Sequence, residues 1–175
     1  MKNESGKSIV ILVILTILIM IGVGIIINYA QQMIIETKEQ DLRTNMLLMQ
    51  AEAKKGLEEV CFRTVNMDSK KEENLAKINE IKQEFLDGIM LSNSPLEVQE
   101  AIKNVPDVTI DESCYYLDEA TLTEMGIKNI NQEEDGYFIV KYDFSNANLE
   151  IINTKGFHGH YTLTQVIQSL EGEQE

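Results

Sequence analysis

The feature that most constrains this chain is an unbroken apolar run from Ile9 to Ile27, in which Thr16 carries the only polar side chain. As an α-helix rising about 1.5 Å per residue, the run is about 28 Å long, close to the roughly 30 Å hydrocarbon core of a bilayer. A soluble domain rarely buries such a segment on all sides. The sequence therefore predicts a single membrane-spanning helix, which we assign to residues 7–28.

The charges on either side of the run predict its orientation. Lys2 and Lys7 precede it, and the first charged residue after it is Glu36. Because basic residues favour the cytoplasmic side, we expect a cytoplasmic N-terminus and an extracytoplasmic C-terminal part. A cleaved secretory signal is the alternative. Its apolar core should be about 7–15 residues long and end in a small-x-small site, but Asn28 takes the upstream small position for a cut after Ala30.

The chain is acidic, with a formal net charge of -14. Lys2, Glu4 and Lys7 sum to +1, so the part beyond the apolar run carries -15. An acidic surface disfavours nucleic acid and anionic lipid headgroups as partners. We therefore expect no nucleic-acid partner, and we interpret the charge as keeping an exported domain soluble.

Residues 29–63 have the periodicity of an amphipathic helix that continues the apolar run. No glycine or proline interrupts the chain from Ile25 to Lys55. An apolar stripe recurs at spacings of three, four or seven residues: it consists of Ile35, Leu42, Met46, Met49, Ala53, Leu57 and Val60. We expect this stripe to pack against the chain's own domain, and packing against another subunit is the alternative.

Residues 64–175 are expected to form an extracytoplasmic α+β region that begins with short helices. One helix is predicted from Asp68 or Ser69, either of which can cap it, to about Met90. Another starts at Ser94-Pro95 and ends near Lys103. A third has Asp118 as its cap and Gly126 as its stop.

Alternation of apolar and polar residues predicts a small antiparallel sheet in the C-terminal third. We expect one strand over residues 137–144, a return strand over residues 149–153, and a third extended segment from Phe157 to Leu163. Turns are predicted at residues 145–148 and at Lys155-Gly156. The predicted fold is thus α+β, with a small sheet of two or three strands that needs a cover, which the amphipathic helix can supply.

The search for chemistry finds few candidate residues. His158 and His160 would point the same way in a strand, with Cα atoms about 7 Å apart, and could bind zinc or copper together with further ligands. Two solvated histidines are the interpretation we favour. Cys61 and Cys114 could form a disulfide in an oxidising location, and two buried thiols are the alternative. We predict no enzyme activity and no cofactor.

The segment Ser5 to Ile14, which reads Ser-Gly-Lys-Ser-Ile-Val-Ile-Leu-Val-Ile, resembles the N-terminus of type IV pilin-like proteins. In that family a short charged leader ends in glycine, and a prepilin peptidase cuts after it. The resemblance implies a leader of residues 1–6, with Gly6 and Lys7 as the cleavage pair. Met125-Gly126 and the segment over residues 136–142 are similar to the end of such chains, where a short helix ending in Met-Gly precedes a strand hairpin.

Two positions depart from the family pattern. Lys7 stands where many pilins have phenylalanine, and Ile11 stands where they have glutamate. That glutamate is thought to neutralise the amino terminus of a neighbouring subunit inside the membrane, where an unpaired charge is costly. The departures suit a minor or specialised subunit.

The resemblance implies a structural subunit of a type IV pilus-like or pseudopilus-like filament or secretion apparatus at the bacterial cell membrane. Its implied partners are the membrane, a prepilin peptidase, the filament assembly machinery, and like or related subunits. Gly22 and Gly24 could allow close approach between helices. The predicted assembly surface consists of Ile9, Val13, Thr16, Met20, Gly22, Gly24 and Ile27. The alternative is a permanently anchored extracytoplasmic binding or adaptor domain.

Overall fold

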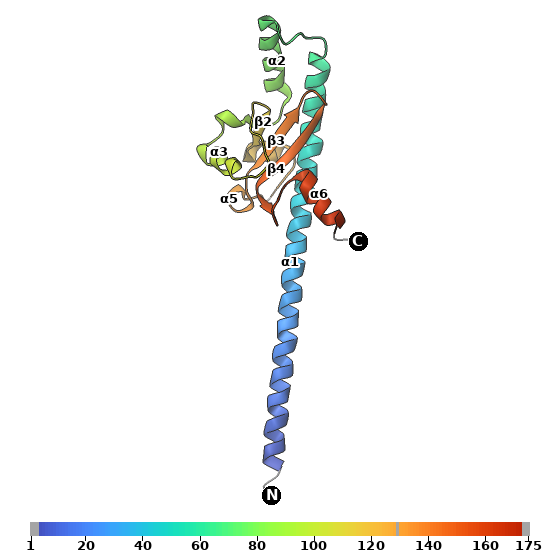
Figure 1. Cartoon of the computed structure of the whole chain (residues 1–175), viewed down its shortest axis with the longest axis vertical. Coiled ribbons are helices and arrows are strands. Elements are labelled where there is room, and N and C mark those ends of the chain that lie inside the picture. Colours follow the sequence, from blue (N-terminus) through green and yellow to red (C-terminus); the bar gives the residue numbers. More distant parts are fainter. Residues whose placement is uncertain (1–3, 129, 173–175) are drawn as a thin grey trace. The chain divides into compact units, whose positions relative to one another are not determined.

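The computed structural model describes the backbone of residues 4–128 and 130–172, and the side chains of residues 29–31, 33–128 and 130–169. The chain divides into two compact units, Met1–Asp41 and Leu42–Glu175. Its fold is α+β, with a long helix and a five-stranded antiparallel sheet (Figure 1).

The helices are α1 (Glu4–Thr64), α2 (Glu72–Phe85), α3 (Leu96–Lys103), α4 (Glu119–Glu124), α5 (Gln132–Asp135) and α6 (Leu163–Gly172), with a short 3-10 helix η1 (Leu91–Asn93). The strands are β1 (Ile89–Met90), β2 (Cys114–Leu117), β3 (Phe138–Asp143), β4 (Asn148–Phe157) and β5 (His160–Thr162). Their spatial order in the sheet is β1-β2-β3-β4-β5, and each neighbouring pair is antiparallel.

Residues 1–28, 32, 129 and 170–175 lie outside the described side chains. They include the predicted membrane-spanning run Ile9–Ile27 with the assembly surface placed on it, and the proposed cleavage pair Gly6 and Lys7. Among the residues whose side chains are described, no helix has the length and apolar character needed to cross a membrane.

The second half of α1 covers one face of the sheet, as its apolar stripe predicted. Met46, Met49, Ala53, Leu57 and Val60 are all fully or almost fully buried. They belong to one apolar cluster, which we call the α1 cluster, together with side chains from β2, β3, β4 and α6. Leu42 packs partly against this cluster, whereas Ile35 lies in the first unit and is exposed. The second compact unit, Leu42–Glu175, therefore includes the end of the predicted amphipathic helix.

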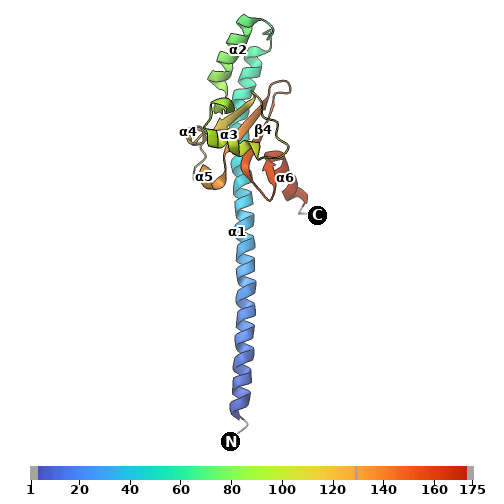
Figure 2. The same cartoon turned by 60° about the vertical axis from the view of Figure 1, so that its left-hand side comes forward.

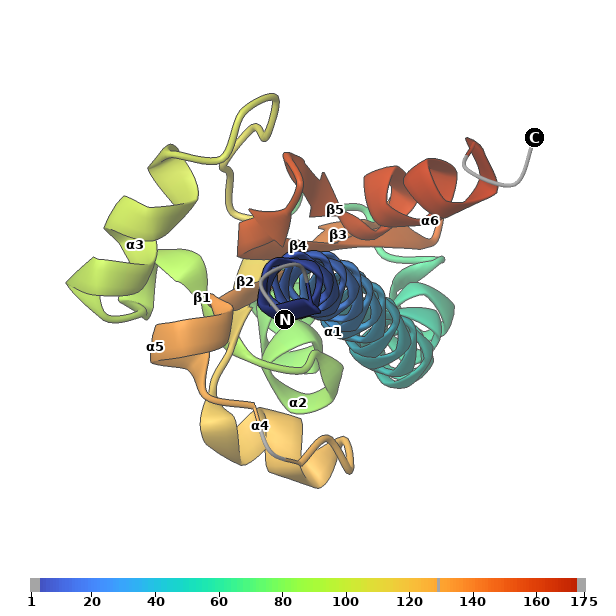
Figure 3. The ribbon, with the colours of Figure 1, turned by 90° about the horizontal axis from the view of Figure 1, so that it is seen from below.

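The opposite face of the sheet is covered as well. Cys114, Tyr116, Ile139 and Ile152 point to that face, and they pack with apolar residues of η1 and α3 in a second cluster, the α3 cluster. The strand predicted over residues 137–144 is present as β3, but the alternation of its residues suggested one buried face, whereas Ile139 is fully buried on the second face. Helix α3 lies near the β1 end of the sheet and α6 near the β5 end (Figure 3).

Helix α2 lies alongside the end of α1 (Figures 1 and 2), and it is shorter than predicted. It begins at Glu72 because the carboxylate of Asp68 accepts a hydrogen bond from the backbone N–H of Lys70, which forms a turn and not a helix start. It ends at Phe85, because Leu86 is extended and Gly88 has a φ of 92°.

Helix α3 lies where it was predicted, but Pro95 and not Ser94 takes its N-cap position, without a side-chain capping bond. Local capping signals correctly located α4. The carboxylate of Asp118 accepts a hydrogen bond of 2.8 Å from the N–H of Thr121, as an N-cap residue should. Gly126 follows α4 with a φ of 78°, a left-handed conformation that favours glycine. Both predictions for α4 are confirmed.

The sheet has more strands than the two or three predicted. Strands β1 and β2 were missed because β1 has only two residues and all four residues of β2 are buried, which leaves no alternation. Strand β4 continues to Phe157, so the predicted turn at Lys155-Gly156 is wrong. The chain reverses instead at His158 and Gly159, whose φ angles are 49° and 84°.

Helix α6 was also missed, because its first residues continue the alternating pattern of β5. The N–H of Gln165 donates to the hydroxyl of Thr162, and the side-chain oxygen of Gln165 accepts from the N–H of Thr162. This reciprocal pair is a capping box, which starts a helix where an extended segment was expected.

Candidate functional site

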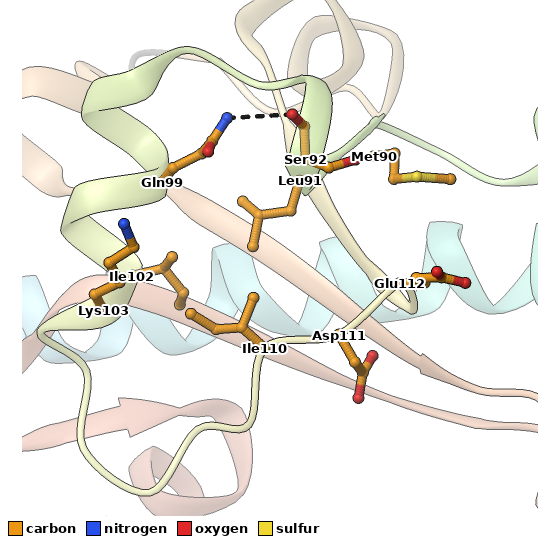
Figure 4. Close-up of a pocket in the computed structure, with 9 residues that line it drawn as sticks. All are labelled: Met90, Leu91, Ser92, Gln99, Ile102, Lys103, Ile110, Asp111 and Glu112. Atoms are coloured by element: carbon orange, nitrogen blue, oxygen red, sulfur yellow. Dashed lines mark hydrogen bonds between the residues drawn. The ribbon is translucent and has the colours of Figure 1, made fainter.

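A pocket of about 270 Å³ opens beside α3, and we call it the α3 pocket. Figure 4 shows its lining side chains, which come from the end of β1, from η1, from α3 and from the loop before β2. They are Met90, Leu91, Ser92, Gln99, Ile102, Lys103, Ile110, Asp111 and Glu112. Leu91 and Ile102 are buried members of the α3 cluster, so the pocket reaches the core on that face of the sheet.

Hydrogen bonds join α3 to η1 on one side of the pocket. The side-chain amide of Gln99 donates to the carbonyl oxygens of Ser94, at 2.8 Å, and Ser92, at 3.3 Å (Figure 4 shows the second). The hydroxyl of Ser94 donates to the carbonyl of Leu91 at 2.8 Å. Because these bonds close η1 onto the start of α3, this wall is fixed before any ligand arrives.

The opposite wall is held by charge. One carboxylate oxygen of Asp111 accepts from the N–H of Ser113 at 2.8 Å, and the other lies 3.3 Å from the ammonium of Lys141 on β3. The ammonium of Lys141 also donates to the carbonyl of Thr109 at 2.7 Å. Hydrogen bonds from Ser113, and then the nearby Lys141, lower the pKa of Asp111. The loop is therefore tied to the sheet while Ile110 stays exposed at the pocket mouth.

The chemistry of the α3 pocket is that of a binding site. Met90, Leu91, Ile102 and Ile110 supply apolar surface. Leu91, Ile102 and Ile110 point toward one another, whereas the carboxylates of Asp111 and Glu112 point away from them (Figure 4). None of the nine lining residues is a histidine or a cysteine. Such a site suits an apolar side chain or another small apolar group held by contact and desolvation.

A second hollow, of about 360 Å³, lies between the end of α1, the end of α2 and α4, and it is acidic. Its charged lining residues are Glu52, Lys55, Glu59, Glu84, Asp87 and Glu124. Burial raises the pKa of Asp87, and the nearby carboxylates of Glu52 and Glu124 raise it further, against smaller opposing effects of a backbone hydrogen bond and of Lys55. The hollow therefore disfavours the charged form of Asp87.

Asp87→Asn should make the protein more stable at pH 7. A carboxyl group with a raised pKa in the folded state stabilises that state below its unfolded pKa, and this contribution is lost as pH rises through the folded pKa. The gain in the variant should therefore shrink as pH falls towards 4 and disappear below it. Denaturant unfolding of both proteins across pH 3.5–7 measures this difference, since near-UV circular dichroism follows the buried tyrosines.

Asp143→Asn is the matched control, and its expected change in stability at pH 7 has the opposite sign. Hydrogen bonds from the side chain and backbone of Asn146 lower the pKa of Asp143. Its contribution to stability is present above the unfolded pKa and is lost as pH falls through the folded pKa. The control variant should be less stable than the wild type at pH 7 and equal to it in acid. Equal pH dependence of the two variants would contradict both assignments.

The two cysteines lie on opposite faces of the sheet. Cys61 packs against the α1 cluster, Cys114 belongs to the α3 cluster, and both are free thiols. Burial raises the pKa of both thiols. The candidate disulfide is therefore not formed in this structure, and the alternative of two unpaired thiols describes it.

The two candidate metal-binding histidines do not share one face of a strand. His158 lies in the turn before β5, where its ring stacks on Phe157 at 4.3 Å, and His160 pairs with Phe157 across the hairpin. Over the part of the chain that the structure describes, no group of three or more histidine, cysteine, aspartate or glutamate residues could hold a metal ion.

Sequence reasoning missed the α3 pocket, because its lining residues come from three separate segments and share no motif. It also missed the close approach of α2 to α1 at Gly56, where an added Cβ would lie 2.0 Å from the carbonyl oxygen of Phe85. A glycine inside a helical pattern was the available signal. Comparison of the chain with protein-family models, curated proteins and solved structures gives no match. The class that the fold defines is an α+β domain built on a long N-terminal helix.

Proposed function

We propose that the chain is a structural subunit, minor or specialised, of a type IV pilus-like or pseudopilus-like filament or secretion apparatus. The apolar run Ile9–Ile27 anchors it in the bacterial cell membrane, with the N-terminus cytoplasmic and the acidic unit outside. Processing after Gly6 by a prepilin peptidase precedes assembly, and the apolar helix then packs against like or related subunits.

The observation that carries this proposal is that one helix, α1, includes both the apolar run and the residues that pack against the sheet. The apolar run falls within the bounds of this helix, and so does the stripe from Met46 to Val60, which forms the core against the antiparallel sheet. A domain that only needed an anchor could be joined to it by a flexible linker. Here Met46, Met49, Ala53, Leu57 and Val60 of α1 are themselves part of the core on this face of the sheet, so the domain cannot be separated from this helix without opening its core.

Assembly through the apolar run must depend on packing, because leaving lipid for a protein neighbour brings no hydrophobic gain. Gly22 and Gly24 would let a neighbouring helix approach closely. Ile11 cannot neutralise the amino terminus of another subunit, which is why we propose a minor or specialised role.

A permanently anchored binding or adaptor domain is the second candidate, and the α3 pocket favours it. The lining of the pocket is largely apolar and is held by internal hydrogen bonds, as the lining of ligand sites commonly is. In this role the apolar run would remain in the bilayer throughout.

Replacing Gly22 and Gly24 together by leucine separates the two candidates. The change keeps the run apolar, so membrane insertion should persist, but the added side chains block close helix approach. In the native host, the wild-type chain should appear both in membranes and in a sheared surface-filament or isolated apparatus fraction, and the double variant in membranes alone.

Ile17 and Ile19 replaced by leucine provide the matched control, since they change two positions of the same run without adding bulk at a glycine. This control should assemble like the wild type. If the wild-type chain never leaves the simple membrane fraction, the filament proposal fails and the anchored binding domain takes its place.

A further inference from the structure

Three consecutive apolar residues of α1 are exposed in the first compact unit, beyond the apolar run. They are Met33, at 53%, Ile34, at 58%, and Ile35, at 42%. Because neighbouring residues of an α-helix point about 100° apart, these side chains face three different directions. Tyr29, one turn earlier, is exposed as well, at 66%. We call residues 28–35 the collar of α1.

An environment that surrounds the helix accounts for this pattern better than a partner on one side does. Where α1 packs against the sheet, its buried apolar residues keep to one stripe, as Met46, Met49 and Ala53 do. In the collar the apolar side chains point to several sides, so a single protein surface would leave some of them in water. A lipid layer, in contrast, contacts a helix on every side at the same depth.

The composition of the collar suits the headgroup layer of a bilayer. Residues 28–35 read Asn-Tyr-Ala-Gln-Gln-Met-Ile-Ile, and the first charged residue after them is Glu36. Three amide side chains within five residues would be costly in the hydrocarbon core. Tyrosine, which has an apolar ring and a polar tip, is enriched at the boundary between lipid and water. The collar therefore fits the layer just outside the hydrocarbon.

The spacing of the charges along α1 matches a whole bilayer. Residues 8–35, between Lys7 and Glu36, carry no charge. As one helix they extend about 42 Å. The hydrocarbon core together with both headgroup layers measures about 40–45 Å, and the core alone about 30 Å. Since the run Ile9–Ile27 accounts for the core, the collar is left for the outer headgroup layer.

We propose that the collar lies in the outer headgroup layer of the bilayer, with Tyr29 towards the hydrocarbon and Glu36 at the aqueous edge. The inference rests on the proposed membrane anchor and deepens it, because it names a lipid contact for residues beyond the apolar run. The collar carries no cation that would attract anionic lipids. Zwitterionic headgroups are therefore sufficient for the contact.

Single tryptophans test this placement, because the chain has no tryptophan of its own. Full-length chains carrying Tyr29→Trp, Met33→Trp, Ile34→Trp or Ile35→Trp are reconstituted at low protein density in phosphatidylcholine vesicles. The lipids carry bromine, which quenches tryptophan emission, either near the headgroup end of the acyl chains or near their methyl ends. Bromine is present in both leaflets, so the direction of insertion does not affect the result.

All four tryptophans should lose about half of their emission to bromine near the headgroup end, because tryptophan settles at that level of a bilayer. Bromine near the methyl ends should quench them less. Similar quenching at positions 33, 34 and 35 would report lipid on each side of the helix that these residues face.

Two further single-tryptophan chains are the controls on either side of the collar. Leu18→Trp, in the middle of the apolar run, should be quenched more strongly by bromine near the methyl ends. Leu48→Trp replaces a residue of the same helix that is 47% exposed but lies beyond Glu36. It should be quenched by neither lipid and should emit at the longer wavelengths of tryptophan in water.

Unquenched tryptophans in the collar, with Leu18→Trp quenched, would overturn the inference and leave the membrane anchor standing. Quenching at only one of positions 33, 34 and 35 would overturn it as well, because a protein surface would then cover the other sides of the helix. An unquenched Leu18→Trp would refute the anchor, and with it the inference and both candidate functions.

Discussion

Gly56→Ala should lower the free energy of unfolding by about 3 kcal/mol, as a strongly overpacked core substitution does. A methyl group at Gly56 would lie 2.0 Å from the carbonyl oxygen of Phe85, far inside van der Waals contact. That oxygen is backbone at the end of α2, so it cannot swing aside as a flexible side chain could. Helix α2 would have to move away from α1.

The direction of this effect is informative, because helix propensity alone predicts the reverse. Alanine in a helix interior is favoured over glycine by about 1 kcal/mol. Ala51→Gly, at an exposed position of the same helix, is the matched control and should lose about 1 kcal/mol. Urea unfolding of the full-length chain in mild detergent gives both values, with near-UV circular dichroism as the signal. A more stable Gly56→Ala protein would mean that α1 and α2 do not approach closely.

Leu57→Ala should lower the free energy of unfolding by about 3 kcal/mol, the usual cost of truncating a buried leucine. Leu57 is fully buried in the α1 cluster, where helix α1 meets the sheet. Its removal leaves a cavity between two rigid elements that cannot collapse to fill it. The same unfolding assay measures the loss.

Leu48→Ala is the control for this position, since it removes the same atoms from the same helix. Leu48 is 47% exposed, so its truncation should change stability by no more than about 0.5 kcal/mol. Equal losses at the two positions would contradict the placement of the sheet on the stripe from Met46 to Val60.

Some of this fold follows directly from local sequence patterns. The stripe on α1 was predictable because its apolar residues keep helical spacing over several turns, and five of them are buried as expected. Asp118 and Gly126 located α4 because each acts on its own backbone, through a capping hydrogen bond and a left-handed φ. Asp143 caps the predicted turn after β3 in the same local way.

The remainder depends on contacts between distant segments, which a single sequence does not display. Strand β2 is buried on both faces, so its side chains lack the alternation that marks a strand. The α3 pocket needs the loop before β2 to be placed by Asp111 and Lys141, residues thirty positions apart. The need for glycine at position 56 follows from the nearby carbonyl of Phe85, which belongs to another helix. Site prediction therefore failed where tertiary packing creates the site.

Intact mass spectrometry of the chain extracted from membranes of its native host tests the central claim most directly. The account predicts a mature chain that begins at Lys7, with the mass of residues 1–6 missing, and retention of those residues when Gly6 is replaced by valine. A membrane-bound chain that still begins at Met1 would contradict a prepilin-type subunit.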